Sequence, residues 1–133
     1  AHALGAKFHI PHGRANAIVL PHVIEFNSGI NKHSKSRKDY PKCVEKYCNV
    51  AKLLGVNNFN EITTIRALTG WIHFMNKEMN IPLSISQCGI DRHEYMNAVE
   101  EMAEKALKDA CTQTNPRVPS KADVCLILEH LYD

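Results

Sequence analysis

The sequence predicts an all-α fold, a compact bundle of five or more helices. Apolar residues recur every third or fourth position in five successive segments, and no segment alternates apolar and polar residues with the period of a strand. The chain has 133 residues, of which 44% are hydrophobic and 23% charged, as is typical of one globular domain. We therefore treat residues 1–133 as a single helical domain.

The first predicted helix runs from about Gly13 to Asn27. Its apolar residues lie on nearly all faces, which indicates a buried helix. Pro21 is expected to bend this helix or to begin a new turn, because proline cannot donate a backbone hydrogen bond. Residues 27–42 are polar and rich in Lys and Arg, so we predict an exposed loop with solvated charges there.

Two further helices are predicted in the middle of the chain. The second runs from about Asp39, which can cap it, to Leu54, and Gly55 ends it. The third runs from about Asn60 to Asn80. It keeps one apolar stripe formed by Ile62, Ile65, Leu68, Ile72, Met75 and Met79.

The last two predicted helices begin with the spacing of a capping box. Asp91 precedes Glu94 by three residues, and the apolar positions then continue to Ala110. Ser120 precedes Asp123 by the same spacing, and the final apolar stripe runs to Leu131.

Charge and cysteine content narrow the class of protein. A formal net charge of +2 is too balanced to indicate a nucleic-acid partner. The longest apolar stretch, from Ala15 to Phe26, is too short and too polar to span a membrane. Five cysteines without a CxxC pair indicate reduced thiols in a cytoplasmic protein. Because no initiator Met or signal peptide is present, we expect a piece of a larger protein.

Three histidines cluster in the first twelve residues: His2, His9 and His12. Imidazole is the commonest metal ligand. His12 opens a helix, where the helix dipole disfavours the charged ring, and a metal requires the neutral one. A catalytic metal needs at least three protein ligands, yet the first acidic residue is Glu25. The pattern predicts a metal or catalytic role for at least one of the three, with further ligands from elsewhere.

The two ends of the chain resemble one enzyme family. AHALGAKFHIPHGRANA resembles the signature A-H-x-L-G-x-x-x-x-x-P-H-G-x-A-N-A of the iron-dependent, or group III, alcohol dehydrogenases. DACTQTNPR is similar to the closing D-x-C-T-x-x-N-P-R segment of that family. FHIPHG and TNPRVP look most like the alcohol-dehydrogenase half of the bifunctional aldehyde–alcohol dehydrogenases. The resemblance covers essentially the whole chain.

The resemblance implies roles for particular residues. Such enzymes pair an N-terminal NAD(P)-binding domain, absent from this chain, with a C-terminal helical domain, and hold a metal between them with one Asp and three His. His12 matches one metal ligand. His2 matches a histidine beside the metal, near the nicotinamide and the substrate, and is a candidate proton relay. Cys111 matches a position near the substrate pocket, whereas His9 matches no ligand and is interpreted as structural or cleft-lining.

The reaction implied by the resemblance is the interconversion of a short-chain aldehyde, acetaldehyde, and its primary alcohol, ethanol, as in fermentation. The implied cofactors are Fe²⁺ and NAD(H), with Zn²⁺ as a substitute for iron. The parent protein is expected to be a homo-oligomer, and the 133-residue chain alone is expected to be inactive.

Two other functions remain open from the residues themselves. One is a non-catalytic helical domain for assembly or interaction, and the other is a small metal carrier that uses histidines only. Replacing His9 separates the carrier from the dehydrogenase, because only the carrier depends on that residue.

Overall fold

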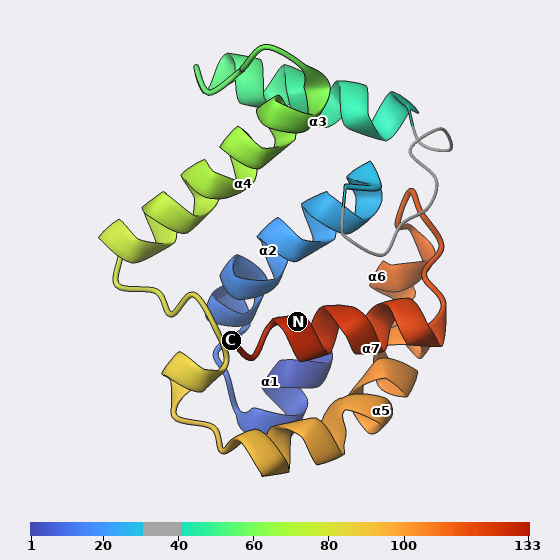
Figure 1. Ribbon diagram of the computed structural model, residues 1–133. Coiled ribbons are helices and arrows are strands. Elements are labelled where there is room, and N and C mark those ends of the chain that lie inside the picture. Colours follow the sequence, from blue (N-terminus) through green and yellow to red (C-terminus); the bar gives the residue numbers. More distant parts are fainter. Residues whose placement is uncertain (31–40) are drawn as a thin grey trace.

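The computed structural model describes residues 1–30 and 41–133, and every regular element in these ranges is a helix (Figure 1). The elements are α1 (His2–Phe8), α2 (His12–Ser28), α3 (Pro41–Leu53), α4 (Glu61–Glu78), the 3₁₀ turn η1 (Ser86–Cys88), α5 (Arg92–Lys108), α6 (Ala110–Gln113) and α7 (Lys121–His130). The predicted all-α fold is confirmed. No helix in the described part of the chain is long and apolar enough to cross a membrane.

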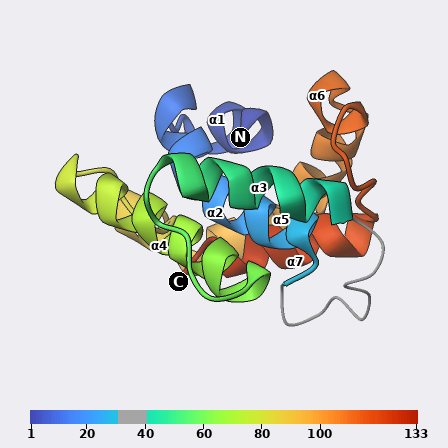
Figure 2. The same cartoon turned by 90° about the horizontal axis from the view of Figure 1, so that it is seen from above.

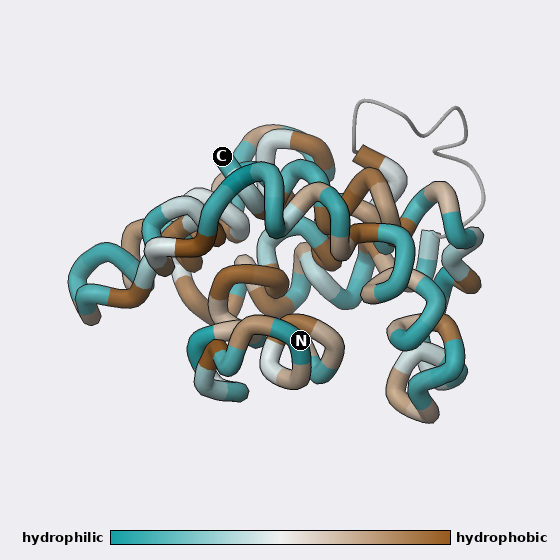
Figure 3. The backbone as a smooth tube through the Cα atoms, turned by 90° about the horizontal axis from the view of Figure 1, so that it is seen from below, coloured by the Kyte–Doolittle hydropathy of each residue, from teal (hydrophilic) through white to brown (hydrophobic). Residues whose placement is uncertain are grey.

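Helix α2 lies at the centre and joins two groups of helices. Near its start it packs against α1, which in turn packs on α5, and α5 packs along α7. Towards its end α2 packs against α3 and α4, and Figure 2 shows α3 crossing over it. Figure 3 shows apolar and polar residues mixed along the helices. The longer helices bury part of their apolar residues, for example Ile65 and Leu68 of α4 and Tyr95 and Met102 of α5.

The first core fills the space between α1, α2, α5 and α7. Its buried side chains include Leu4, Ile18, Tyr95, Met102 and Leu131. Hydrogen bonds close it across long sequence separations, since the Tyr95 hydroxyl donates to the Leu128 carbonyl at 2.8 Å and the Ile85 amide donates to the Leu131 carbonyl at 2.8 Å. Burial raises the pKa of Tyr95, so its hydroxyl keeps the proton that it donates.

The second core is smaller and lies between α2, α3 and α4. Its buried residues are Ile24, Val44, Ala51, Ile65 and Leu68. Large apolar side chains stay exposed around the connection from α3 to α4, among them Leu53 at the end of α3 and Phe59 in the connection itself. The two cores therefore differ in size and in how completely they cover apolar surface.

Helix α2 continues through Pro21 as one helix, so no new turn begins there. Proline lacks the N–H that would bond the carbonyl four residues earlier, which here belongs to Ala17. The side-chain amide of Asn76, buried on α4, donates to that Ala17 carbonyl at 2.9 Å. A side chain from another helix thus replaces the missing backbone donor, which explains why the helix is not interrupted.

The predicted helix ends are largely confirmed. Asn60 caps α4, and Ser120 and Asp123 form the expected capping box of α7. Asp91 caps α5 by accepting a hydrogen bond from the Glu94 amide. The expectation that Asp39 caps the second helix concerns residues outside the described ranges, as does most of the predicted basic loop.

Three short elements were not predicted: α1, η1 and α6. The fourth helix was also expected to reach Ala110, but α5 ends at Lys108. Asp109 adopts an extended conformation there and caps α6 through a hydrogen bond from the Cys111 amide to its carboxylate. The break matters because it turns the Asp109 side chain towards the start of α1, as described next.

Candidate functional site

A cavity of about 370 Å³ lies where the start of α1, one side of α2, the α5–α6 junction and α7 meet. Most of its wall is apolar and includes Leu4, Val19, Val23, Phe26, Val124, Ile127 and Leu128. Four titratable side chains also line it: His2, His12, Asp109 and Cys111. An apolar pocket with a few convergent polar groups is the usual form of a small-molecule site.

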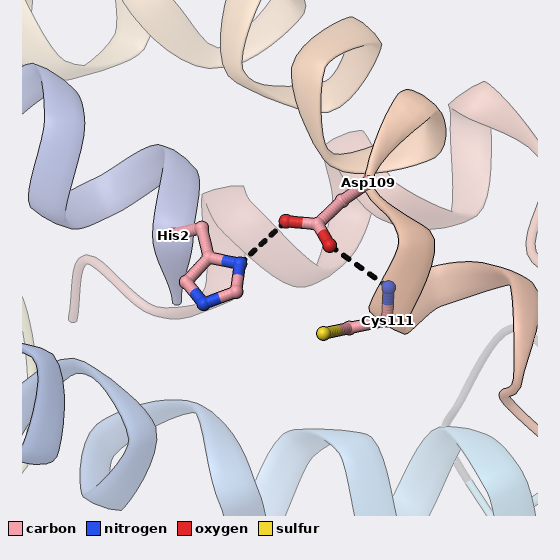
Figure 4. A group of neighbouring side chains, drawn as sticks. All are labelled: His2, Asp109 and Cys111. Atoms are coloured by element: carbon pink, nitrogen blue, oxygen red, sulfur yellow. Dashed lines mark hydrogen bonds and ion pairs between the residues drawn. The ribbon is translucent and has the colours of Figure 1, made fainter.

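His2 forms a hydrogen-bonded pair with Asp109. Its Nδ1 lies 2.5 Å from Asp109 Oδ2, and the other carboxylate oxygen accepts from the Cys111 amide at 2.9 Å (Figure 4). That amide bond, followed by the bond with His2, holds the pKa of Asp109 below its ordinary value. An ionised carboxylate can only accept, so Nδ1 carries the hydrogen and the lone pair lies on Nε2, which Figure 4 shows pointing away from Asp109.

His12 stands beside this pair as the first residue of α2. Its ring stacks on that of His2 with the centroids 5.0 Å apart and an angle of 17° between the planes. The Asn16 amide nitrogen lies 2.9 Å from His12 Nε2, so this ring nitrogen accepts and carries a lone pair. An imidazole lone pair at the cavity wall is the donor that a divalent metal requires, so this residue fits the predicted role of a single metal ligand.

Cys111 is the third predicted site residue that lines the cavity. It lies on α6 and is exposed. Its Sγ and the nearest ligand atoms of His2 and Asp109 all lie within 4.8 Å of one another. The structure therefore brings together all three side chains that the resemblance singles out, two from the start of the chain and one from near its end.

His9 stands apart from the site. It ends α1 in the left-handed conformation with a φ of 55°, is exposed, and is not among the residues that line the cavity. Its amide donates to the Gly5 carbonyl at 3.0 Å. Gly5 itself permits a close approach, because a Cβ there would meet the Ile10 carbonyl oxygen at 3.2 Å. His9 thus serves the turn between α1 and α2 and lies outside this cavity, as expected of a residue that matches no metal ligand.

Asp109 is the site residue that sequence reasoning missed. Asp109 is the first residue of the DACTQTNPR segment. Its sequence neighbours indicate only that a helix continues or ends there, and give no sign of a functional role. The available signal was the need for an acidic group near the histidine cluster, combined with the placement of Asp109 two residues before Cys111. Only folding shows that its carboxylate reaches His2.

Two residues of the closing N-P-R segment, Asn115 and Arg117, contact the end of α2 next to the cavity. The side-chain amides of Asn115 and buried Asn27 bond each other reciprocally, at 2.8 and 3.0 Å. Arg117 lies over the Phe26 ring, 4.0 Å from its centroid, and donates to the Phe26 carbonyl at 2.6 Å. These contacts fix the α6–α7 loop to the end of α2, so the motif positions one wall of the cavity.

Comparison with known proteins shows which family the chain belongs to. Residues 1–132 match the model of the Fe-containing alcohol dehydrogenase family, C-terminal. The chain is 37% identical to an NADPH-dependent butanol dehydrogenase of Clostridium saccharobutylicum, over 99% of this chain and 31% of that protein. It is 34% identical to the bifunctional aldehyde-alcohol dehydrogenase of Escherichia coli, over 99% of this chain and 15% of that protein.

The fold of the chain also matches that of a solved structure. The chain superposes on the crystal structure of a 1,3-propanediol oxidoreductase with a TM-score of 0.79 and 26% sequence identity, over 98% of this chain and 31% of that one. It thus spans less than a third of the length of each of these relatives. The family resemblance seen in the two terminal motifs is confirmed: the chain belongs to the Fe-containing alcohol dehydrogenase family and corresponds to its C-terminal helical domain.

Proposed function

We propose that residues 1–133 form the metal- and substrate-binding side of an NAD(H)-dependent, Fe²⁺-dependent alcohol dehydrogenase. The parent enzyme would interconvert a short-chain aldehyde, acetaldehyde, with its primary alcohol, ethanol. The observation that carries the proposal is the convergence of His2, His12 and Asp109 on one mostly apolar cavity. Two relatives, a butanol dehydrogenase and an aldehyde-alcohol dehydrogenase, support this class of substrate.

His12 is the residue of this chain that would hold the metal. The Asn16 amide donates to its Nε2, and this short side chain can turn aside to let the nitrogen bind a metal. The remaining ligands and the nucleotide-binding fold would come from the preceding domain of the parent. When bound, the divalent metal supplies Lewis acidity at the substrate oxygen, and the nicotinamide supplies the hydride. Zn²⁺ suits the same ligand type and is a substitute for Fe²⁺.

His2 would move the proton that the reaction gains or releases at the substrate oxygen. Asp109 holds its Nδ1–H, so Nε2 is the nitrogen left for proton exchange. The ring is also half exposed, with 54% of the side chain accessible, which gives the proton a route to water. The same position makes His2 the residue of this chain that would contact the nicotinamide. Asp109 acts through His2 and is therefore a positioning residue.

The cavity wall would select a small alkyl group. Val19, Val23 and Phe26 on α2 face Ile127 and Leu128 on α7. Such a wall gains binding energy from an alkyl chain but offers no charged partner for an acid or a phosphate group. Cys111 lies at the same wall near the pair of His2 and Asp109, so we place it beside the substrate.

The parent is expected to be a cytoplasmic homo-oligomer. All five cysteines are free thiols, which suits a reducing compartment.

The direct test is turnover by the full-length parent with acetaldehyde and NADH under anaerobic conditions with added Fe²⁺. We expect activity that His12→Gln abolishes together with stoichiometric iron binding, and that His9→Gln leaves unchanged. The 133-residue chain should be inactive in the same assay. Turnover by the chain alone, or full activity of the His12→Gln enzyme, would contradict the proposal.

A further inference from the structure

We propose that His2, Asp109 and Cys111 form a second divalent-cation site that takes Zn²⁺ and is distinct from the site served by His12. The imidazole nitrogen, the carboxylate oxygen and the thiol sulfur lie within 4.8 Å of one another. They come from opposite ends of the chain, and Figure 4 shows the Cys111 sulfur and the His2 ring on the same side of the Asp109 carboxylate. No other three-donor group this close is found among the described residues.

The donor set selects zinc. Zinc is bound in proteins by Cys sulfur, His nitrogen and carboxylate oxygen, and three protein ligands with an open fourth position are typical of a zinc site accessible to solvent. Magnesium and calcium prefer oxygen ligands only, so the thiol and the imidazole disfavour them. His2 and Cys111 are exposed, and 21% of the Asp109 side chain is accessible, so water can occupy the fourth position.

A small movement would open the site. Ligand bonds of about 2.0–2.3 Å in a tetrahedral site place the donors about 3.4 Å apart. The 2.5 Å contact between His2 Nδ1 and Asp109 Oδ2 must therefore lengthen by about 1 Å. His2 is the first residue of its helix, and Asp109 lies at the break between α5 and α6, so turning these side chains leaves the helices in place.

The proton balance of the binding step is simple. The Cys111 thiol loses its proton to solvent, and the His2 ring moves its hydrogen from Nδ1 to Nε2, so one proton leaves for each zinc ion bound. The zinc then faces one thiolate and one carboxylate, which together match its charge.

Binding of zinc here would have a consequence that rests on the proposed function. The ion would bind Nδ1 of His2, the nitrogen that now contacts Asp109. Nε2 would then carry the ring hydrogen and could no longer accept a proton from the substrate. Zinc added beyond the ion at His12 should therefore inhibit the parent enzyme. His12 itself remains outside the second site, because its Nε2 contacts Asn16 and its ring stacks on a face of the His2 ring, whereas His2 meets Asp109 through Nδ1 at the edge of that ring.

The test uses Co²⁺ as a spectroscopic substitute for zinc, titrated anaerobically into the 133-residue chain. We expect a sulfur-to-cobalt charge-transfer band that Zn²⁺ removes at one equivalent. Cys111→Ser should abolish the band, and Asp109→Asn should weaken zinc binding at least ~10-fold. Asn also caps helices, so this variant keeps the start of α6, and far-UV circular dichroism confirms the fold.

Matched variants identify the site. Cys125→Ser and His12→Gln should both retain the cobalt band. A band that survives Cys111→Ser, or one that is lost in His12→Gln, would overturn the proposal, as would the absence of any sulfur band. Because these spectra are recorded without turnover, their failure is separate from failure of the dehydrogenase proposal. In the parent enzyme, Cys111→Ser should raise the concentration of inhibitory zinc ~10-fold or more.

Discussion

The two halves of the molecule are stabilised in different ways, and only one of them builds the site. The site half comprises α1, α5, α6, α7 and the side of α2 that lines the cavity, and the distal half comprises α3, α4 and the side of α2 that packs on them. In the site half, the bond between His2 and Asp109 spans 107 residues of sequence. In the distal half, α3 and α4 are neighbours in sequence and pack directly on each other. Assembly of the cavity therefore requires contacts between the two ends of the chain.

The halves also differ in their surfaces. The site half buries its large side chains in the first core and directs its titratable groups into the cavity. The distal half leaves Phe59 fully exposed and Leu53 88% exposed. The titratable groups of the cavity are thus separated from the distal half along α2, whereas exposed apolar side chains occur in both halves, since Val118 in the α6–α7 loop is 85% exposed. Each prediction below tests that separation or the contacts that join the halves.

The largest expected effect is on catalysis in the site half. His2→Gln in the full-length parent should lower kcat ~10²–10⁴-fold, because a positioned proton-transfer group contributes about that factor. His73→Gln, on α4 of the distal half, is the matched control and should leave kcat within a factor of about two. Steady-state kinetics with acetaldehyde and NADH measure both. Equal losses in the two variants would show that the separation between the halves is wrong.

Local pattern was enough to predict the long helices. The stripes of α4, α5 and α7 repeat over several turns, and the caps at Asp91 and Ser120 lie where the sequence places them. The missed helices α1 and α6 have seven and four residues, too few for a periodic pattern to stand out. Propensity alone also suggested an interruption at Pro21, since the compensating donor, Asn76, lies 59 residues away.

The site was predictable only in part. The motifs assigned His2, His12 and Cys111, and the structure brings all three to one cavity. Asp109 could not be found in this way, because its bond to His2 joins residues 107 positions apart and no sequence pattern marks such a distant partner. The role of the N-P-R residues was likewise hidden, since Asn115 is recognisable as a clamp only once Asn27 lies opposite it.

A second prediction concerns pH and the helix shared by both halves. Burial, followed by the nearby His73 and His130, lowers the pKa of His22 on α2 to about 4 from its ordinary 6.5. In the unfolded chain, His22 therefore binds a proton as the pH falls below 6.5, whereas in the folded chain it does so only near pH 4. Stability should fall as pH drops through this window, by at most ~1.4 kcal/mol per pH unit and by less because the ring is partly exposed.

Urea unfolding at pH 7.5, 6 and 5 measures this dependence. His22→Gln should flatten the part of the profile between pH 6.5 and 4, whereas above pH 6.5 its slope should match that of the wild type. Single His73→Gln and His130→Gln variants, one on α4 and one on α7, should each reduce the slope by a smaller amount, because each removes one of the lesser causes. An unchanged slope in His22→Gln would assign the acid sensitivity to other groups.

The smallest predicted effect tests the bond that joins α4 to α2. Asn76→Ala leaves the Ala17 carbonyl without its donor, which should cost ~1–3 kcal/mol in the free energy of unfolding. Pro21→Ala restores a backbone N–H to the same carbonyl, so Asn76→Ala should cost less in the Pro21→Ala background. A double-mutant cycle by urea denaturation measures this coupling. Additive costs would mean that Asn76 stabilises the interface of the two halves by packing, and that α2 tolerates Pro21 without the replacement donor.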